Sequence, residues 1–163
     1  LNIVKLAEPQ RDRLRADRIG LVFQQFNLLP GFTALENVLV AMSFGSQVSS
    51  KERAESLLEA VGLAERFHHK PATMSIGQQQ RVAVARALAN RPRVLLADEP
   101  TASIDPSHQQ QVIDLLQTTC REEEVALLVV THAPEVAEQF PVRHRLEDFN
   151  RAAAVHPTTS GVY

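Results

Sequence analysis

Short apolar runs alternate along this chain with longer segments in which apolar residues recur at helical spacing. The runs at 18–23, 93–97 and 125–130 are rich in Leu, Val and Ile, and this pattern predicts three strands. Because the second and third runs are apolar almost throughout, we expect strands buried on both faces, as parallel strands usually are. A more polar run at 142–148 predicts a last strand.

N-terminal capping signals predict where the helices between these runs begin. Thr33 and Ser49 each stand three positions before a Glu, which is the spacing of a capping box. Ser75 precedes a third helical segment, and Asp105 is followed by Pro at the first helical position of a fourth. The expected helices cover 34–42, 49 to about 61, 75–89, 105–123 and a short segment from 134.

The order of these elements predicts an α/β fold. Helices predominate from Thr33 to Asn90, whereas strand and helix alternate from Arg93 onward, and that alternation is typical of a parallel sheet. The helical stretch predicts a subdomain that is inserted into the domain of the sheet. The expected organisation is one domain over 1–150, with the helical subdomain at about 33–91 and the core at 1–32 and 92–150, followed by a disordered tail over 151–163.

The composition of the chain limits which partners and which cellular compartment are expected. The formal net charge of −2 gives no bulk attraction to nucleic acid or to anionic lipid. The longest uninterrupted apolar run, Val125 to Val130, is far too short to cross a bilayer. The single cysteine, Cys120, excludes an internal disulfide and fits a reducing cytosol. Its place in a predicted helix indicates a small apolar filler rather than a reactive thiol.

Polar residues follow three of the predicted strands at their carboxyl ends, where ligands bind in open α/β sheets. Gln24, Asp98 and His132 occupy these positions, and Glu99 stands beside Asp98. One acid could hold Mg²⁺ through its oxygen atoms, and the other could orient a water for attack on phosphorus. Taken singly, each residue also fits an ordinary role, as a solvated strand end, a structural histidine or a loop glutamine.

The helix that begins after Ser75 offers a second candidate site. Its free backbone N–H groups and partial positive charge favour an anion such as phosphate, and Gly77 allows a close backbone approach. The same residues also fit an ordinary capped amphipathic helix. The pair His68 and His69 predicts no metal site, because adjacent side chains project in different directions and no third ligand lies near in the sequence.

Five short motifs in this order resemble the ATP-binding cassette (ABC) ATPases, and the resemblance extends to about Asn150. "VFQQFNLLP" is similar to the Q-loop, "MSIGQ" to the signature motif L-S-G-G-Q, and "RVLLADEP" to the Walker B motif with its catalytic Glu. "TASID" resembles the D-loop and "VVTH" the H-switch. Within the family, "FQQFNLLPGFTALENV" resembles ATPases of the macrolide-export and lipoprotein-release type, and "RLEDFNR" is similar to related bacterial exporter subunits.

The resemblance implies a role for each candidate residue. Asp98 would help to hold Mg²⁺, Glu99 would be the general base that orients water, and His132 would contact the γ-phosphate. Gln24 would sense Mg²⁺ and the attacking water, and would couple the site to a membrane partner. In this family each nucleotide lies between two subunits. The residues implied to face the ATP that the other subunit holds, or to lie at the dimer seam, are Ser75, Gly77, Gln78 and Asp105.

The resemblance also implies ligands, partners and a location. The chain would bind ATP and Mg²⁺, pair with a second ABC ATPase subunit as a homodimer, and engage a membrane permease through the helical lobe. It would lie peripherally on the cytoplasmic face of the inner membrane. Its implied activity is ATP hydrolysis coupled to membrane transport, with export as the direction in this sub-family. No nucleic-acid partner is implied.

Two departures from the family pattern bear on this implied activity. Ile76 replaces the first Gly of the signature motif, although we expect Gly77 to keep the phosphate-facing backbone open. More seriously, the sequence contains no G-x-x-x-x-G-K-[ST] phosphate loop, which the family carries upstream of the Q-loop. The expectation is therefore an N-terminally truncated ABC subunit that is inactive alone.

Two other classes of function stay open. The first is a non-catalytic interaction module that docks a permease or an ABC partner, and a genuine start at Leu1 would favour it. The second is a soluble ABC ATPase of DNA repair. The sequence supports this second class least, because such proteins carry long coiled-coil or zinc insertions between the Q-loop and the signature motif.

Overall fold

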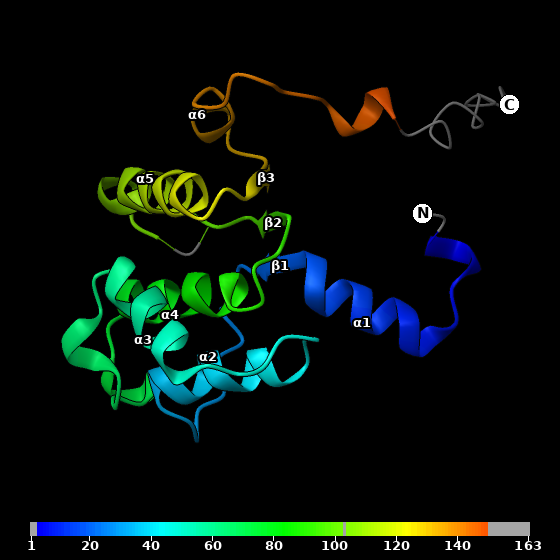
Figure 1. Ribbon diagram of the computed structural model, residues 1–163. Coiled ribbons are helices and arrows are strands. Elements are labelled where there is room, and N and C mark those ends of the chain that lie inside the picture. Colours follow the sequence, from blue (N-terminus) through cyan, green and yellow to red (C-terminus); the bar gives the residue numbers. More distant parts are fainter. Residues whose placement is uncertain (1–2, 103, 150–163) are drawn as a thin grey trace, which may run out of the picture. The chain divides into compact units, whose positions relative to one another are not determined.

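A computed structural model describes residues 3–102 and 104–149, with a three-stranded parallel sheet in its first part (Figure 1). The strands are β1 (Ile19–Val22), β2 (Val94–Asp98) and β3 (Ala126–Val130), and they lie in the order β1-β2-β3. Each strand forms where an apolar run predicts it. The predicted α/β class with a parallel sheet is confirmed.

The chain divides into two compact units, one up to Thr131 and one from His132 onward. The first unit contains the sheet and five helices of ten or more residues. The second contains the one-turn helix α6 (Pro134–Ala137) and a 3₁₀ turn at Leu146–Asp148. The domain boundaries expected from the sequence stay a prediction.

The strand predicted over 142–148 is wrong. The described sheet has three strands, and none of them pairs with this stretch. Without a neighbouring strand, the backbone groups of a single strand have no partners. The chain turns instead, and the Asp148 carboxylate accepts a hydrogen bond from the Arg145 amide at 3.4 Å. The tail predicted over 151–163 lies outside the described residues.

Local capping sets the starts of the helices in the first unit. Thr33 and Ser75 act as caps where predicted, and each hydroxyl oxygen accepts from the amide three residues ahead at 3.2 Å. The start predicted at Ser49 is wrong by one residue. Ser50 is the cap, because its hydroxyl accepts from the amide three residues ahead at 3.1 Å and donates to Glu52 at 2.8 Å. The helices are α1 (Glu8–Arg18), α2 (Ala34–Ser43), α3 (Lys51–Ala60), α4 (Ile76–Leu88) and α5 (Pro106–Glu122).

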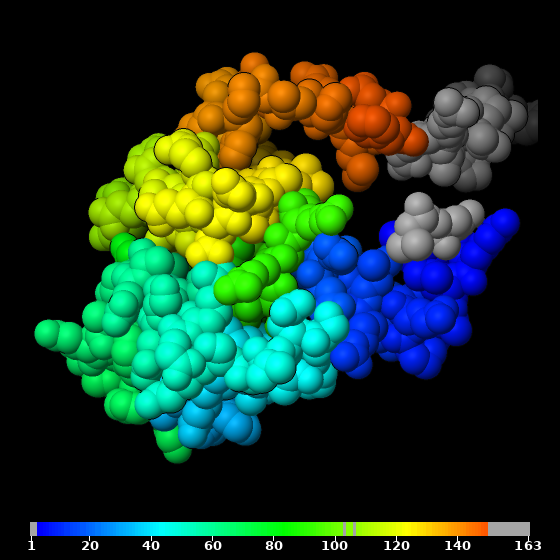
Figure 2. All heavy atoms as spheres, viewed as in Figure 1, coloured from blue at the N-terminus to red at the C-terminus, as the bar shows by residue number. Residues whose placement is uncertain are grey.

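Helix α1 has no counterpart among the predicted elements, because no apolar stripe marks it. None of its residues is buried, and Arg11 and Arg15 pair with acids on neighbouring turns. Near its end, the Asp17 carboxylate accepts hydrogen bonds from the Ser46 amide at 2.6 Å and the Ser46 hydroxyl at 2.7 Å. In Figure 2 this helix (blue) stands out beside the close-packed helices drawn in cyan and green.

We call α2, α3 and α4 the helical lobe (Figure 1), and their buried side chains form part of the hydrophobic core. Each presents an apolar stripe to the other two. Val38 of α2, Leu57 and Leu58 of α3, and Val82 and Leu88 of α4 are all fully buried. No helix in residues 3–102 or 104–149 is both long enough and apolar enough to cross a membrane.

One face of the sheet completes this core. Leu95 and Ala97 of β2 are buried on it, next to α4 on the β1 side and α5 on the β3 side (Figure 1). Gly20 permits the close contact with α4, since a Cβ at this position would lie 2.4 Å from Ala87 O. Leu116 of α5 is fully buried in the same cluster.

The other face of the sheet, which we call the open sheet face, lacks such a cover among the described residues. Leu21 is 42% exposed, and Leu128 and Val130 are each 56% exposed. Leu96 lies in register between Leu21 and Leu128 and is half-buried. The expected burial on both faces is therefore wrong for the described residues, because α4 and α5 cover the same side.

Candidate functional site

The two acids predicted to act on nucleotide lie at the carboxyl end of β2. Asp98 is the last residue of β2 and is exposed, whereas Glu99 is half-buried and has a φ of +46°. The left-handed conformation costs a non-glycine residue about 1–2 kcal/mol, and such strain clusters at functional sites. The Glu99 amide donates to Val130 O at 2.9 Å, which fixes this bend to the end of β3.

Sequence reasoning missed the residue that holds the Glu99 carboxylate. Thr131 directly follows β3, and its hydroxyl donates to Glu99 Oε2 at 3.2 Å. Because parallel strands end at the same edge of a sheet, residues that follow β2 and β3 come within reach of each other. The two residues are 32 positions apart in sequence, so only the predicted strand order could have pointed to this pair.

Gln24 lies near the same edge, two residues beyond β1, and is exposed. Two side chains of the helical lobe anchor the loop that begins with it. Arg86 of α4 donates to two backbone carbonyls of this loop at 2.6 and 2.7 Å. The buried Asn37 side chain of α2 accepts from the Leu29 amide at 2.8 Å. The loop therefore connects the sheet edge to the lobe through hydrogen bonds.

The remaining residue predicted for this edge, His132, belongs to the second unit. It follows Thr131 in the sequence and is exposed. The first unit thus brings Gln24, Asp98 and Glu99 to one edge of the sheet, and the role of His132 at the γ-phosphate stays a prediction.

The second predicted site begins at the N-terminus of α4. The Ser75 amide donates to Gln78 Oε1 at 3.0 Å, which completes the capping box. Ser75, Ile76 and Gly77 are exposed. A Cβ at Gly77 would meet no atom within 4 Å, so the first helical turn is open to an approaching anion. The replacement of glycine by Ile76 leaves this opening in place.

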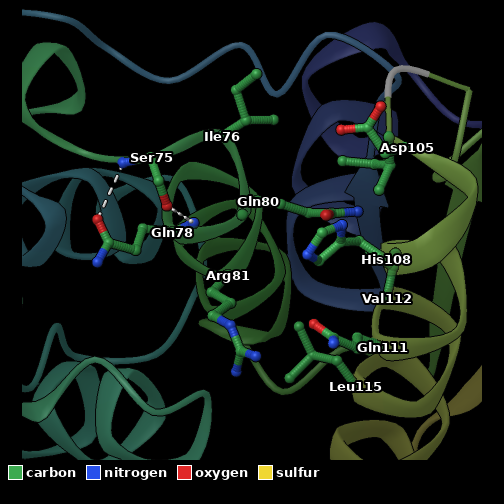
Figure 3. A pocket seen from close by; sticks show the side chains of 12 residues that line it. Ser75, Ile76, Gln78, Gln80, Arg81, Asp105, His108, Gln111, Val112 and Leu115 are labelled. Carbon is green, nitrogen blue, oxygen red and sulfur yellow. Dashed lines mark hydrogen bonds between the residues drawn. The ribbon is translucent and has the colours of Figure 1, made fainter.

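These residues border a cavity of about 450 Å³ between α4 and α5 (Figure 3). Asp105, the N-cap residue of α5, lies across it from the start of α4. Of the predicted residues, Ser75, Gly77 and Gln78 also line it. The described lining residues are Ser75, Ile76, Gly77, Gln78, Gln80, Arg81, Ile104, Asp105, His108, Gln111, Val112 and Leu115. The acids of the sheet edge are not among them, so the predicted residues form two separate groups.

Gln80, which sequence reasoning did not single out, connects these two groups. Its side chain is 1% exposed, and its Nε2 donates to Pro100 O at 2.8 Å. Pro100 directly follows Glu99. A buried carbonyl that loses such a donor carries an unmet desolvation cost. This hydrogen bond therefore ties the second turn of α4 to the loop of the catalytic candidate.

The metal chemistry available in the first unit rests on oxygen ligands. No three His, Cys, Asp or Glu side chains cluster within the part of the chain that the structure describes. Asp98 offers one exposed carboxylate. That suits Mg²⁺, which usually takes one or two carboxylates and completes its shell with water and phosphate oxygens. Cys120 is buried, and burial raises the pKa of its thiol to about 11, as expected for an unreactive filler.

Comparison with protein sequences gives matches over most of the chain. A protein-family model described as "ABC transporter" matches residues 2–102. The lipoprotein-releasing system ATP-binding protein LolD 2 of Caulobacter vibrioides is 49% identical over 135 residues, covering 82% of this chain and 59% of that protein. The macrolide export ATP-binding/permease protein MacB of Syntrophobacter fumaroxidans is 45% identical over 141 residues, covering 84% of this chain and 20% of that protein.

Comparison with solved structures agrees. A dimeric ATP-binding cassette in a post-hydrolysis state, bound to ADP and Pi, matches with a TM-score of 0.68 and 44% identity. The match covers 82% of this chain and 60% of that one, so the chain spans about three fifths of this cassette and of the LolD 2 relative. Since the family model covers more than half of the sequence, this chain belongs to the ABC transporter family of ATP-binding proteins.

Proposed function

We propose that this chain forms part of the ATP-hydrolysing subunit of an ABC transporter, which couples ATP hydrolysis to membrane transport in the direction of export. Glu99 carries the proposal. Its carboxylate lies at the ligand edge of the sheet, in a left-handed backbone conformation, and receives a hydrogen bond from Thr131. A general base needs a fixed position beside the proton that it removes, and strained backbone persists where the surrounding structure enforces it.

In this proposal the sheet-edge residues act on one γ-phosphate. Glu99 accepts a proton from the water that attacks phosphorus, while the Thr131 hydroxyl keeps the carboxylate oriented. Asp98 and Gln24 supply oxygen ligands to Mg²⁺, which when bound neutralises charge on the phosphates. His132 donates a hydrogen bond to a γ-phosphate oxygen. Its position in the sequence, two residues after β3, supports this role.

The cavity-side residues serve a second nucleotide in the same proposal. Ser75, Gly77 and Gln78 face the γ-phosphate of ATP held by a second ABC subunit, and Asp105 lies at the dimer seam. The exposed first turn of α4 supports this role, as does the similarity to a dimeric cassette. Without a G-x-x-x-x-G-K-[ST] loop in its sequence, the chain alone is expected neither to bind ATP tightly nor to hydrolyse it.

The partners follow from the relatives. Their names describe a lipoprotein-releasing system and a macrolide exporter with a permease. We infer that this chain pairs with a second copy and engages a permease through the helical lobe, on the cytoplasmic face of the inner membrane. The hydrogen bonds from Arg86 and Asn37 to the loop after Gln24 support such coupling, because they join the lobe to the sheet edge.

A second candidate function is a non-catalytic module that docks a permease or an ABC partner. The exposed first turn of α4 fits this function too, since docking through that turn needs no phosphate loop in the same chain. The two candidates differ in one respect. Only the ATPase requires Glu99 to act on a nucleotide once a phosphate loop is present.

A fusion experiment separates them. The segment of an ABC ATPase that precedes the Q-loop and carries its G-x-x-x-x-G-K-[ST] phosphate loop would be joined to this chain, and steady-state phosphate release would be measured. We expect ATP turnover from the fusion. Glu99→Gln should lower the rate at least ~100-fold, which is the usual contribution of a general base, while ATP binding stays intact.

The matched control is Glu65→Gln, an exposed glutamate of the 3₁₀ turn Ala64–Arg66. It makes the same chemical change away from the sheet edge, and its turnover should equal that of the unaltered fusion. A folded fusion that binds ATP and hydrolyses it at the same rate with Gln at position 99 would reject the proposed base.

A further inference from the structure

The cavity between α4 and α5 has the size and lining of a small-molecule site. Its volume of about 450 Å³ falls within the range of about 300–1,000 Å³ that such sites occupy. Val112 and Leu115 give it an apolar wall on the α5 side, beside His108 and Gln111 (Figure 3). Ile104 also lines it. Polar groups reach it from the α4 side at Gln80 and Arg81. An apolar wall with a few convergent polar groups is the usual form of a ligand pocket.

Gln80 presents an unused acceptor to this cavity. Its Nε2 is engaged with Pro100 O, which fixes the orientation of the side-chain amide. Its Oε1 accepts no hydrogen bond from any residue that the structure describes. The side chain is 99% buried, yet it lines the cavity. An amide oxygen can accept up to two hydrogen bonds, so a ligand N–H or O–H that reaches Gln80 Oε1 would gain a specific contact.

Arg81 gives one end of the cavity a positive charge. Its Nη1 donates to Val61 O at 2.8 Å, and no carboxylate of the described residues lies within ion-pair distance of its guanidinium. The carboxylate of the cavity, Asp105, lies well away from Arg81 in Figure 3. Further donors of the guanidinium can therefore serve an anionic group at this end.

We propose that this cavity binds a small, planar, largely apolar carboxylate that also carries an N–H donor. The donor meets Gln80 Oε1, the apolar body packs on Val112 and Leu115, and the carboxylate lies toward Arg81. This ligand is distinct from the nucleotide of the proposed function, which faces Ser75 and Gly77 at the start of α4. Binding requires neither a phosphate loop nor ATP hydrolysis, so it stands or falls separately from the ATPase.

The test uses indole-3-acetate as the probe, because it combines an apolar bicyclic ring, one N–H and one carboxylate. It would be titrated into the isotope-labelled full chain, with NMR shifts of backbone amides and of the Gln80 side-chain amide as the readout. We expect saturable shifts confined to residues that line the cavity, with a dissociation constant of about 1 mM or below. Absence of saturable shifts up to about 10 mM would overturn the proposal.

Probe variants test the two polar contacts without altering the protein. 1-Methylindole-3-acetate lacks the N–H, and indole-3-acetamide lacks the charge. Each should bind at least about fivefold more weakly, since each leaves one polar group of the cavity without its partner. Equal affinity of all three compounds would overturn the assigned contacts.

A protein variant tests the location. Leu115→Trp places a larger ring on the half-buried wall of the cavity and should abolish the shifts. The matched control is Leu128→Trp on the open sheet face, which adds the same ring elsewhere and should leave binding unchanged. Each variant's amide spectrum reports its folding. Shifts that persist in folded Leu115→Trp would place the probe elsewhere and reject the site.

Discussion

The helical lobe and the sheet bury their apolar residues to different degrees. In the lobe, stripes from three helices meet one another, and Leu57 and Leu58 are fully buried. In the sheet, the strands carry equally apolar sequences, but Leu128 and Val130 remain more than half exposed. An amphipathic helix buries its apolar residues when one side packs against a neighbour, whereas a strand in a parallel sheet has apolar residues on two faces, and each face must be packed against other elements. Similar apolar content therefore gives a closed core in one region and an open face in the other.

The candidate functional residues divide along the same line. Ser75, Gly77 and Gln78 begin a helix whose buried side belongs to the closed core. Asp98 and Glu99 end a strand of the sheet that carries the open sheet face. Gln80 and Arg86 link the two regions through hydrogen bonds to backbone carbonyls. We infer that the lobe stabilises the sheet edge on which the acids lie.

The largest expected effect comes from the same substitution made once in each region. Leu58→Ala should lower the free energy of unfolding by about 2–5 kcal/mol, because it leaves a cavity in a fully packed core. Leu128→Ala should change it by no more than about 0.5 kcal/mol, because that side chain is mostly exposed. Urea denaturation of the purified chain measures both. Similar decreases in the free energy of unfolding at the two positions would contradict the difference between the lobe and the sheet.

A smaller effect is expected at Glu99, on the sheet side. Both Glu99→Ala and Glu99→Gly remove the carboxylate, but only glycine relieves the cost of the left-handed backbone. The glycine variant should therefore be more stable than the alanine variant by about 1–2 kcal/mol in urea denaturation. If alanine proved equally stable, the backbone at this position would not be strained, and the observation that carries the proposed function would be lost.

A structural feature of this protein could be predicted from its sequence when a few neighbouring residues determine it. The caps at Thr33 and Ser75 and the three apolar strands follow from patterns a few residues long, so they could be predicted. The one-residue shift to Ser50 shows the limit of such patterns where two hydroxyl residues are adjacent. Helix α1 was not predicted, because its sequence carries charge pairs and no apolar stripe.

The long-range parts of the candidate site could not be predicted in the same way. The motif order pointed to Asp98 and Glu99, but the hydrogen bond from Thr131 depends on β2 and β3 ending at one edge. The contact of Gln80 with Pro100 joins residues 20 positions apart and depends on how α4 packs. The open sheet face was unexpected because an apolar run marks a strand as suited to burial without showing what covers it.

The smallest predicted effect concerns the contact between Asp17 of α1 and Ser46 in the loop between α2 and α3. Hydrogen bonds from Ser46 lower the pKa of Asp17 below its ordinary value of 3.8. The bond from the backbone amide has the larger effect, and the bond from the hydroxyl the smaller. A carboxyl whose pKa is lowered by folding stabilises the folded state above its unfolded value, and this contribution is lost as pH falls through the folded value. The Ser46 amide shift should therefore titrate with a midpoint below 3.8.

Asp17→Asn is the control for this titration, because it keeps an acceptor but removes the ionisable group. The Ser46 amide should then lose its transition at acid pH. A midpoint at or above 3.8 in the unaltered chain would show that the charged form gains nothing from Ser46.

The central claim, that the helical lobe is closed while the sheet has an open face, is tested most directly by native-state hydrogen exchange on the purified chain. The amides of α3 and α4 should exchange only through global unfolding, whereas those of β3 should exchange through smaller openings, at least about tenfold faster. Protection of β3 equal to or greater than that of α3 and α4 would contradict the account, because it would show that the sheet is as firmly closed as the lobe.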